Sequence, residues 1–550
     1  MAVQAHRLAV TVIAAALFLT GGVSLDGARA LRISAQAGGE DLPSERSGSR
    51  QQTQPSLETA QKVDSALDKS TALVPFAFND VVKKAKALAD APYKEPQKKA
   101  PAAAAKLDYD QYRRIEFKRE AADWSNSPDS LFRIHYETEG FLFTTPVAIN
   151  IVDNGRVTPR PYRADDFRFF DLPLTDADKN ALDIAGFHLT TPMNVGGKFD
   201  DLINFKGASF FRVLSAGTNY GASARGLALS TASPSGEEFP YFKEFWIVHP
   251  QAEQSNIVIY ALMDSRRASG AFKFTVTPGV QTIVDVDATI FPRTDLTEVG
   301  IAPLSSMFDF APHDPAPKKQ DYRPAVHDSE GLMIEQKNGE WVWRPLINPK
   351  QLEISSFAHE PPAGFGLIQR DRDPNSYQDF EANYDKRPSI WITPKSDWGS
   401  GELILVEIPT ENEFNDNIVT FWRPKDAWKK GAPVKIAYRM YWGLTTPAQP
   451  TVARIKATRT GVDINSGERL FVIDFDTHDT GLADGAVPKV TTTAGAIKNV
   501  QIAKNPVTEG LRLTFGLDTD GVDLAELRAY LTNGADKQIS ETWLYRWRPE

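Results

Sequence analysis

The sequence predicts an all-β protein, with a large antiparallel β-sandwich followed by a smaller sandwich. Two observations support this fold class. In several stretches apolar residues alternate one by one with polar residues, which is typical of strands that bury one face. Turn-forming residues interrupt these stretches often, and long helical patterns are scarce. With 550 residues, the chain is long enough for several domains.

The first 30 residues carry the pattern of a secretory signal peptide. His6 and Arg7 form a short basic start, an apolar run extends from Leu8 to Leu19, and Ala28-Arg29-Ala30 is a small-x-small cleavage signal. The apolar run is too short for a good membrane span, and no later segment is apolar enough. We therefore expect an exported protein with no membrane span after the signal is removed.

Three segments precede the predicted strands. Residues 31–73 are rich in Ser, Gln, Glu and Arg and predict a disordered leader. Apolar residues repeat at helical spacing over Phe78–Ala89, which predicts a short amphipathic helix capped by Asn79. Residues 92–106 are rich in Pro, Lys and Ala and predict a linker.

The large sandwich domain is expected over residues 74–445. From about residue 110 the apolar period becomes two, most clearly in the runs Phe132–Glu137, Phe272–Val276 and Val284–Ile290. Frequent turn signals between such runs favour an antiparallel arrangement.

Residues 446–550 are expected to form the second sandwich. Thr445, Thr446, Pro447 and Pro450 separate them from the first domain, and short strand patterns follow. About 100 residues of short strands is the size of an immunoglobulin-like domain.

Composition excludes several function classes. The net charge is −9 and no basic stretch dominates, which argues against a nucleic-acid partner. The chain has no Cys, so it has no disulfide and no thiolate chemistry. The eight His are not paired at metal-ligand spacing, and no zinc, P-loop or serine-hydrolase motif is present. We expect no metal and no cofactor.

Carboxylates remain as chemical groups, and glycoside hydrolysis uses a pair of them. Four polar, aromatic-flanked segments in the middle of the chain are candidates, but each also has a plain structural interpretation. Asn415–Asn417 is typical of a turn. Trp341 and Trp343 share a strand face and fit a core. Arg370 and Arg372 could pair with nearby aspartates at the surface. The candidate segments are residues 322–332, 339–346, 364–389 and 412–422.

These segments resemble the osmoregulated periplasmic glucan biosynthesis proteins, the OpgG/OpgD (MdoG/MdoD) family. The resemblance covers most of residues 74–445, and SETWLYRW at 540–547 extends it to the C-terminus. The matching strings are SARGLAL (223–229), PSGEEFP (234–240), KEFWI (243–247), APLSSMF (302–308), HDSEGL (327–332), NGEWVWRPL (338–346), GFGLIQRDRD (364–373) and NDNIV (415–419).

The resemblance implies a galactose-mutarotase-like β-sandwich followed by an immunoglobulin-like domain, a periplasmic location, and a β-1,2-glucan chain as substrate. Some members resemble inverting endo-β-1,2-glucanases, and a relative is a transglycosylase. The family's general acid matches Asp416. Its general base, which acts through a relay of substrate hydroxyl and water, matches Asp328. The two aspartates are 88 residues apart, so only the fold can bring them together.

Other residues of the matching segments are candidates for a glucan cleft. Aromatic residues would line it, and arginines would bind sugar hydroxyls. The candidates are Tyr322, Trp341, Trp343, Tyr384 and Trp422, with Arg323, Arg370 and Arg387.

Two departures from the family pattern are visible. Phe414 occupies a position where a small polar residue is expected beside the acid. Such a ring could lower the rate, change the preferred chain length or favour transfer over hydrolysis. The signal peptide carries Arg7 but no twin arginine, which favours the OpgG branch.

Three functions stay open at this point. The first is a glucan-cleaving or glucan-transferring enzyme. The second is a non-catalytic periplasmic scaffold that receives the nascent glucan from the inner-membrane glucan synthase. The third, a sugar epimerase or lyase on the same sandwich, fits the aspartate pair less well.

Overall fold

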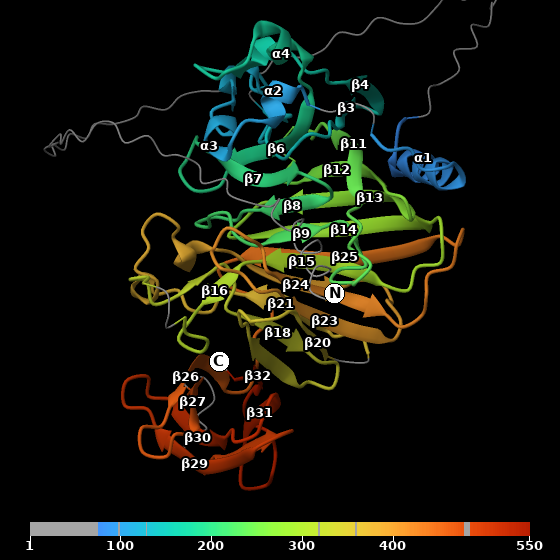
Figure 1. Ribbon diagram of the computed structural model, residues 1–550. Coiled ribbons are helices and arrows are strands. Elements are labelled where there is room, and N and C mark those ends of the chain that lie inside the picture. Colours follow the sequence, from blue (N-terminus) through green and yellow to red (C-terminus); the bar gives the residue numbers. More distant parts are fainter. Residues whose placement is uncertain are drawn as a thin grey trace, which may run out of the picture. The chain divides into compact units, whose positions relative to one another are not determined.

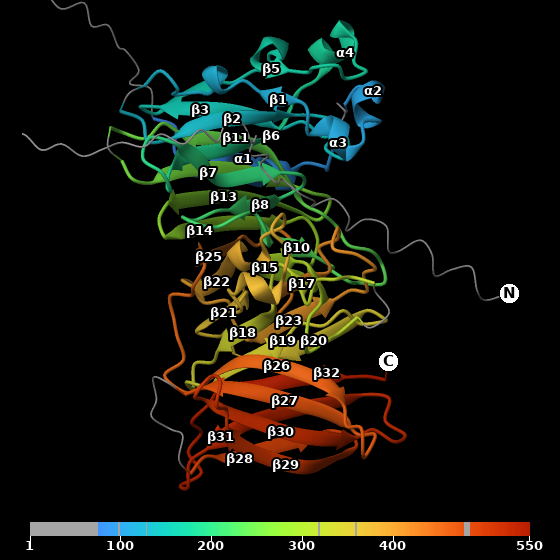
Figure 2. The same cartoon turned by 90° about the vertical axis from the view of Figure 1, so that its left-hand side faces the viewer.

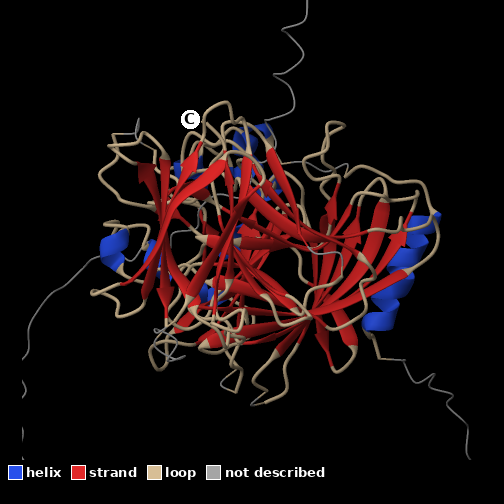
Figure 3. Cartoon of the chain, turned by 90° about the horizontal axis from the view of Figure 1, so that it is seen from below, coloured by secondary structure: helices blue, strands red, loops and turns tan. Residues whose placement is uncertain are grey.

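The computed structural model describes residues 75–96, 100–127, 129–252, 254–316, 320–357, 360–477 and 485–549. The predicted signal peptide (1–30) and leader (31–73) lie outside these ranges. Strands are the main regular element of the described chain, and the short helices lie around their periphery (Figure 1, Figure 3). The all-β prediction is therefore confirmed.

Two large sheets carry the structure. The first has ten strands, and β10 (Ala228–Leu229) pairs with β15 beside the main path. Its other strands, in spatial order, are β2 (Arg133–Thr138), β6 (Ile184–Pro192), β7 (Phe199–Lys206), β8 (Phe210–Val213), β9 (Ser223–Arg225), β15 (Val299–Ser306), β24 (Ile418–Pro424), β23 (Gly401–Glu407) and β20 (Glu353–Phe357).

The second sheet has fourteen strands and joins the two halves of the chain. Its spatial order is β28 (Val487–Thr492), β31 (Ala525–Thr532), β32 (Thr542–Trp547), β19 (Trp341–Pro345), β18 (Gly331–Glu335), β21 (Gly364–Ile368), β22 (Ser389–Pro394), β25 (Val434–Gly443), β14 (Gln281–Pro292), β13 (Ala268–Thr277), β12 (Ile257–Asp264), β11 (Tyr241–Val248), β3 (Ala148–Asp153) and β4 (Arg156–Pro159).

The alternating runs in the sequence are buried strands of these sheets. Phe272 and Phe274 on β13, and Val284 and Val286 on β14, are at most 1% exposed. An aromatic cluster links the sheets, because the ring of Phe205 on β7 lies 5.1 Å from that of Phe274. Both sheets therefore share one hydrophobic core.

The predicted amphipathic helix is present as α1 (Phe78–Asp90). It packs on the outer side of β12, β13 and β14, with Val81 and Ala85 fully buried (Figure 1). Its N-cap is Ala77, so the prediction of Asn79 as the cap is wrong: the helix already begins at Phe78, and the backbone N–H of Ala77 donates to Asp80.

The remaining elements are short. A helix, α2, falls inside the segment predicted as a linker. The helices and 3₁₀ turns are α2 (Ala102–Ala105), α3 (Tyr109–Tyr112), η1 (Arg119–Ala121), η2 (Ala164–Asp166), α4 (Asp176–Ala181), η3 (Pro374–Ser376) and η4 (Tyr384–Lys386). The two-stranded sheets are β1 (Glu116–Phe117) with β5 (Phe167–Arg168), and β16 (Phe308–Phe310) with β17 (Val326–His327).

The C-terminal part forms the immunoglobulin-like sandwich. One of its sheets has four strands (Figure 2), and the other is the group β28, β31 and β32 at the end of the fourteen-stranded sheet. Strand β32 pairs in parallel with β19 of the large domain, so the hydrogen-bonded sheet runs through the domain boundary. The four strands are β26 (Arg454–Val462), β27 (Arg469–Asp476), β30 (Leu511–Asp518) and β29 (Ala496–Lys504).

Among the residues that the structure describes, no helix combines the length and apolar character needed to cross a membrane.

Candidate active site

Asp416 lies at the end of the loop that joins β23 to β24, and only 7% of it is exposed. Its neighbour Asn417 anchors this end of the loop. The amide of Asn417 donates to the carbonyls of Phe308 (2.9 Å) and Ile408 (3.0 Å) and accepts from the Phe308 N–H (2.8 Å). A buried side chain with three such bonds sets the position of the preceding aspartate.

Asp328 lies between β17 and β18 and is 8% exposed. Its backbone N–H donates to the carbonyl of Met307, at 2.9 Å. Its Oδ1 lies 3.3 Å from Nε of Arg387, but neither of these two buried atoms has a well-aligned hydrogen bond to a described residue. This carboxylate edge therefore keeps its hydrogen-bonding capacity for a ligand.

The two aspartates share one electrostatic environment. Burial raises the pKa of Asp328 to about 6, and the charge of Asp416 raises it further against the opposing charge of Arg387. Burial also raises the pKa of Asp416, while Arg212 and Ser223 oppose this rise. Arg212 on β8 lies 3.8 Å from Oδ2 of Asp416, and the Ser223 hydroxyl donates to it at 3.4 Å. The fold thus brings both aspartates into one charged cluster.

Gln369 connects the Asp328 segment to η4. Its amide group donates to the carbonyls of His327 (2.9 Å) and Tyr384 (3.0 Å). Because both amide hydrogens are used there, its oxygen faces Nδ1 of His327, which donates to it at 2.8 Å. Burial lowers the pKa of His327 to about 4, so this imidazole is neutral near pH 7. Gln369 is 1% exposed and holds the residue before Asp328 in place.

Tyr384 and Arg387, two of the residues predicted for a cleft, lie beside Asp328. Tyr384 is fully buried, yet its hydroxyl has no hydrogen-bond partner among the described residues. The charge of Asp328 helps to raise the pKa of Tyr384, and the Arg387 guanidinium lies 5.3 Å from its ring centroid. The Tyr384 hydroxyl and the Asp328 carboxylate together present unsatisfied polar atoms at one place.

Arg323 is also near the aspartates, but its guanidinium is occupied by carboxylates. It lies 2.8 Å from Asp321, 2.8 Å from Asp379 and 2.6 Å from Glu413. The expectation that Arg323 binds sugar hydroxyls directly does not fit this arrangement. The adjacent Tyr322, another predicted cleft residue, is 78% exposed.

Four other predicted cleft residues are packed inside the protein. Trp422 on β24 is fully buried in the main core. Trp343 is 1% exposed, and the Arg370 guanidinium lies 3.7 Å from its ring centroid. Arg370 itself binds Glu541 of the C-terminal sandwich at 2.6 Å. These three residues and Trp341 stabilise the packed interior, and we assign them no contact with sugar.

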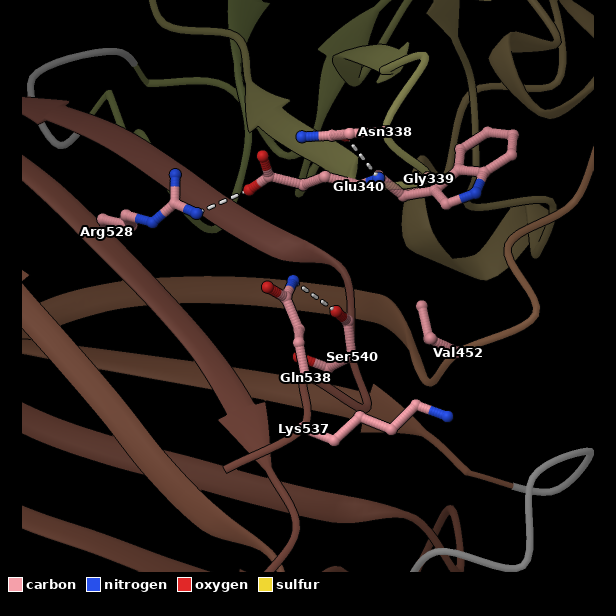
Figure 4. A pocket seen from close by; sticks show the side chains of 9 residues that line it. Asn338, Gly339, Glu340, Val452, Arg528, Lys537, Gln538 and Ser540 are labelled. Atoms are coloured by element: carbon pink, nitrogen blue, oxygen red, sulfur yellow. Dashed lines mark hydrogen bonds and ion pairs between the residues drawn. The ribbon is translucent and has the colours of Figure 1, made fainter. Parts of the chain in front are cut away.

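Trp341 also lines a pocket of about 340 Å³ where β19 meets the C-terminal strands (Figure 4). Its polar groups already bind one another. Glu340 pairs with Arg528 at 2.5 Å, and Gln538 donates to Ser540 and Thr542. We therefore assign no ligand to it. The lining residues are Asn338, Gly339, Glu340, Trp341, Val452, Arg528, Lys537, Gln538 and Ser540.

The sequence reasoning missed several residues that build the site. Arg212 and Ser223 come from β8 and β9, nearly 200 residues before Asp416, and nothing local marks them. Ser223 does open the matching string SARGLAL, and Gln369 lies in GFGLIQR. Buried polar residues within those strings were the signal that could have found them.

The chain matches one family of known proteins over most of its length. Residues 76–547 match the family described as "Periplasmic glucan biosynthesis protein, MdoG". A "Glucans biosynthesis protein G" from Shewanella sp. (strain MR-7) is 41% identical over 533 residues, covering 96% of both chains. The protein of that name from Vibrio cholerae serotype O1 (strain ATCC 39541) is 41% identical over 476 residues, covering 86% of this chain and 87% of its own.

Among solved structures, the galactose mutarotase related enzyme from Lactobacillus acidophilus covers 44% of this chain and 97% of its own. It has 9% sequence identity to this chain and a TM-score of 0.20. The family match over nearly the whole described chain, together with the long alignments to curated relatives, shows that this chain belongs to the MdoG family of periplasmic glucan biosynthesis proteins.

Proposed function

We propose that this chain is a periplasmic enzyme of glucan biosynthesis that cleaves or transfers β-1,2-glucan backbones with inversion at the Asp328–Asp416 site. The family and the names of the relatives support the role in glucan biosynthesis. One observation carries the catalytic part. Two buried aspartates, 88 residues apart in the sequence, share one charged cluster in which burial raises the pKa of both.

In this proposal Asp416 is the general acid. It donates its proton to the glycosidic oxygen as the bond from that oxygen to the anomeric carbon breaks. A raised pKa keeps a larger share of Asp416 protonated near neutral pH, which a general acid requires. The Ser223 hydroxyl and Arg212 on Asp416 Oδ2 orient the carboxyl group.

Asp328 is the general base. A water molecule attacks the anomeric carbon from the face opposite the leaving oxygen, and its proton passes through a substrate hydroxyl to Asp328. In transfer, a sugar hydroxyl replaces this water. The buried Tyr384 hydroxyl and the Asp328 Oδ1 atom are suited to hold the relaying groups, because neither has a hydrogen-bond partner among the described residues.

A non-catalytic glucan-binding scaffold is the second candidate, and the contact of Arg212 with Asp416 favours it. A cation 3.8 Å from the carboxylate stabilises its ionised form, which cannot donate a proton. In that case the same residues bind glucan without turnover.

Incubation of the purified protein with linear β-1,2-glucan separates the two candidates. The enzyme predicts shorter or cyclised products from the wild type, with inverted anomeric configuration by NMR. Asp416→Asn and Asp328→Asn should each lower the rate by about 10³-fold or more, because each removes one proton transfer. Intact glucan binding with no product from the wild type would support the scaffold. Residual turnover in Asp328→Asn at the wild-type rate would contradict the assigned base.

A further inference from the structure

Arg323 joins three separate loops beside the two aspartates. Asp321 belongs to the segment before β17, Asp379 to the segment between η3 and η4, and Glu413 to the loop that carries Asp416. Arg323 has low exposure, at 15%, as do its partners, at 20%, 10% and 21%. A planar guanidinium with several fixed donors can serve three carboxylates at once, which an ammonium group cannot do with the same geometry.

Arg323 and its three carboxylate partners form an ion-pair node, which we call the node below. This node also borders the proposed catalytic site. Glu413 lies three residues before Asp416 on the same loop, and its charge raises the pKa of both Asp328 and Tyr384. Asp379 in turn organises its own loop, because its Oδ1 accepts from the N–H groups of Glu381 (3.0 Å) and Ala382 (2.8 Å). The three loops are therefore held together at the edge of the site.

Each of the three loops carries an exposed aromatic side chain directly next to a member of the node. Phe380 follows Asp379, and Phe414 follows Glu413. They are 75% and 55% exposed. Tyr322, between Asp321 and Arg323, is 78% exposed. Among the described residues, the only other strongly exposed aromatic side chain is Phe170. Exposed rings are costly in water, and three of them placed directly beside residues of one ion-pair node indicate a surface that a ligand covers.

We infer that Arg323 is a positioning residue that fixes these three loops, so that Tyr322, Phe380 and Phe414 form an aromatic rim on which glucose rings beyond the scissile linkage stack. The inference rests on the proposed function for the identity of the ligand. Apolar faces of sugar rings suit such aromatic surfaces, and the node holds the rings in place before the chain binds. The rim would then determine the length of glucan that the protein prefers.

The first test measures the node without any ligand. Hydrogen–deuterium exchange is compared in the wild type, Arg323→Gln, Arg323→Lys and the control Arg439→Gln. Arg439 on β25 donates two hydrogen bonds to Asp285 on β14, at 2.8 and 2.7 Å. Both strands belong to the fourteen-stranded sheet. We expect amides of residues 379–383 and 411–415 to exchange about ten-fold faster in Arg323→Gln, with partial recovery in Arg323→Lys and no change in the control.

The second test measures binding, in an Asp416→Asn background that does not depend on turnover. Calorimetry compares a long linear β-1,2-glucan with the β-1,2-linked disaccharide. Tyr322→Ala, Phe380→Ala and Phe414→Ala should each raise the Kd for the long glucan by about five-fold and leave the Kd for the disaccharide within about two-fold. Phe170→Ala should change neither. Arg323→Gln should weaken binding of the long glucan at least as much as any single rim variant.

The outcomes separate the rim from the catalytic proposal. If the wild type releases no product but the rim variants weaken binding of the long glucan, the aromatic rim is supported and only the proposed catalytic activity is overturned. In an active enzyme, the rim variants should raise the KM for long glucan more than they lower kcat. An unchanged Kd in all three rim variants, no binding by the parent protein, or unchanged exchange in Arg323→Gln would each overturn the inference.

Discussion

At Asp328, burial and a neighbouring cation act in opposite directions on one carboxyl group. Burial dominates and raises the pKa from 3.8 to about 6, although Arg387 favours the charged form. Folding therefore favours the protonated acid. The contribution of Asp328 to the free energy of unfolding is fully present below about pH 4 and is lost as the pH rises through about 6. A shift of this size corresponds to about 3 kcal/mol.

Asp328→Asn should remove this dependence on pH. We expect the variant to gain stability relative to the wild type between pH 4 and pH 7, because asparagine carries no charge into the buried site. Urea denaturation gives the free energy of unfolding of both proteins at pH 4 and at pH 7. The difference between variant and wild type should be about 3 kcal/mol larger at pH 7 than at pH 4. An equal difference at both pH values would mean that Asp328 titrates normally in the folded protein.

The residues of the site were only partly predictable. Asp328 and Asp416 could be predicted only through strings that match the family, because no local pattern distinguishes two aspartates among 71 acidic residues. Trp343 lies on β19, a strand whose residues are all buried, and Arg370 beside its ring binds Glu541, which is 171 residues away, so no local pattern shows that either is structural. Arg323 looked like a sugar ligand because its partners Asp379 and Glu413 are 56 and 90 residues away.

At the scale of elements, the turn between β8 and β9 positions both arginines of the site. The carbonyl of Gly221 accepts from Nε of Arg212 at 3.4 Å. The side chain of Arg387 packs against the Cα of the same glycine, where a Cβ would lie 3.0 Å from Cδ and 3.2 Å from Cβ of Arg387. A glycine is needed here because of this close approach, and not because of its backbone angles.

Gly221→Ala should therefore displace Arg387 from Asp328. We expect kcat on β-1,2-glucan to fall by about ten- to a hundred-fold, because small displacements of positioning groups have large effects on rate. Gly461→Ala on β26 is the matched control, since nothing lies within 4 Å of its added Cβ. Steady-state rates and thermal melts of both variants check the result. Equal rates in the two variants would show that Arg387 adjusts without consequence.

Gln369 joins two elements, the end of β21 and the turn η4, to the segment that carries Asp328. Gln369→Leu would leave two buried carbonyls and the Nδ1–H of His327 without partners. We expect a loss of roughly 2–5 kcal/mol in the free energy of unfolding. Chemical denaturation measures this loss. Gln351→Leu, at an exposed position on the edge of β20, is the control and should stay within about 0.5 kcal/mol.

At the scale of the molecule, the fold class could be predicted more fully than the connections between its parts. The runs on β13 and β14 reveal strands because one face of each is buried in the shared core. The sequence break near residue 446 falls between β25 and β26, the first strand of the four-stranded sheet. It does not reveal that β32 pairs with β19, since a parallel contact across some 200 residues leaves no local pattern.

The Arg370–Glu541 pair is one of several ion pairs between the C-terminal strands and the large domain. Glu541 is fully buried and also accepts from the backbone N–H of Ile455, at 2.7 Å. Glu541→Ala would leave Arg370 without its main partner and should lower the free energy of unfolding by about 3–5 kcal/mol. Urea denaturation followed by tryptophan fluorescence measures this loss, because Trp343 lies under Arg370. A change below about 1 kcal/mol would show that the pair contributes little.

The parallel pairing of β19 with β32 has a consequence for the order in which the protein matures. Residues 542–547 come about 200 residues after β19, yet they complete the pairing of β19, which lies beside β18, the strand that follows Asp328. Contacts over such a sequence distance form late. The sheet next to Asp328 is therefore complete only once β32 has been made, so removal of residues 542–547 should leave β19 with an unpaired edge and loosen the segment around Asp328.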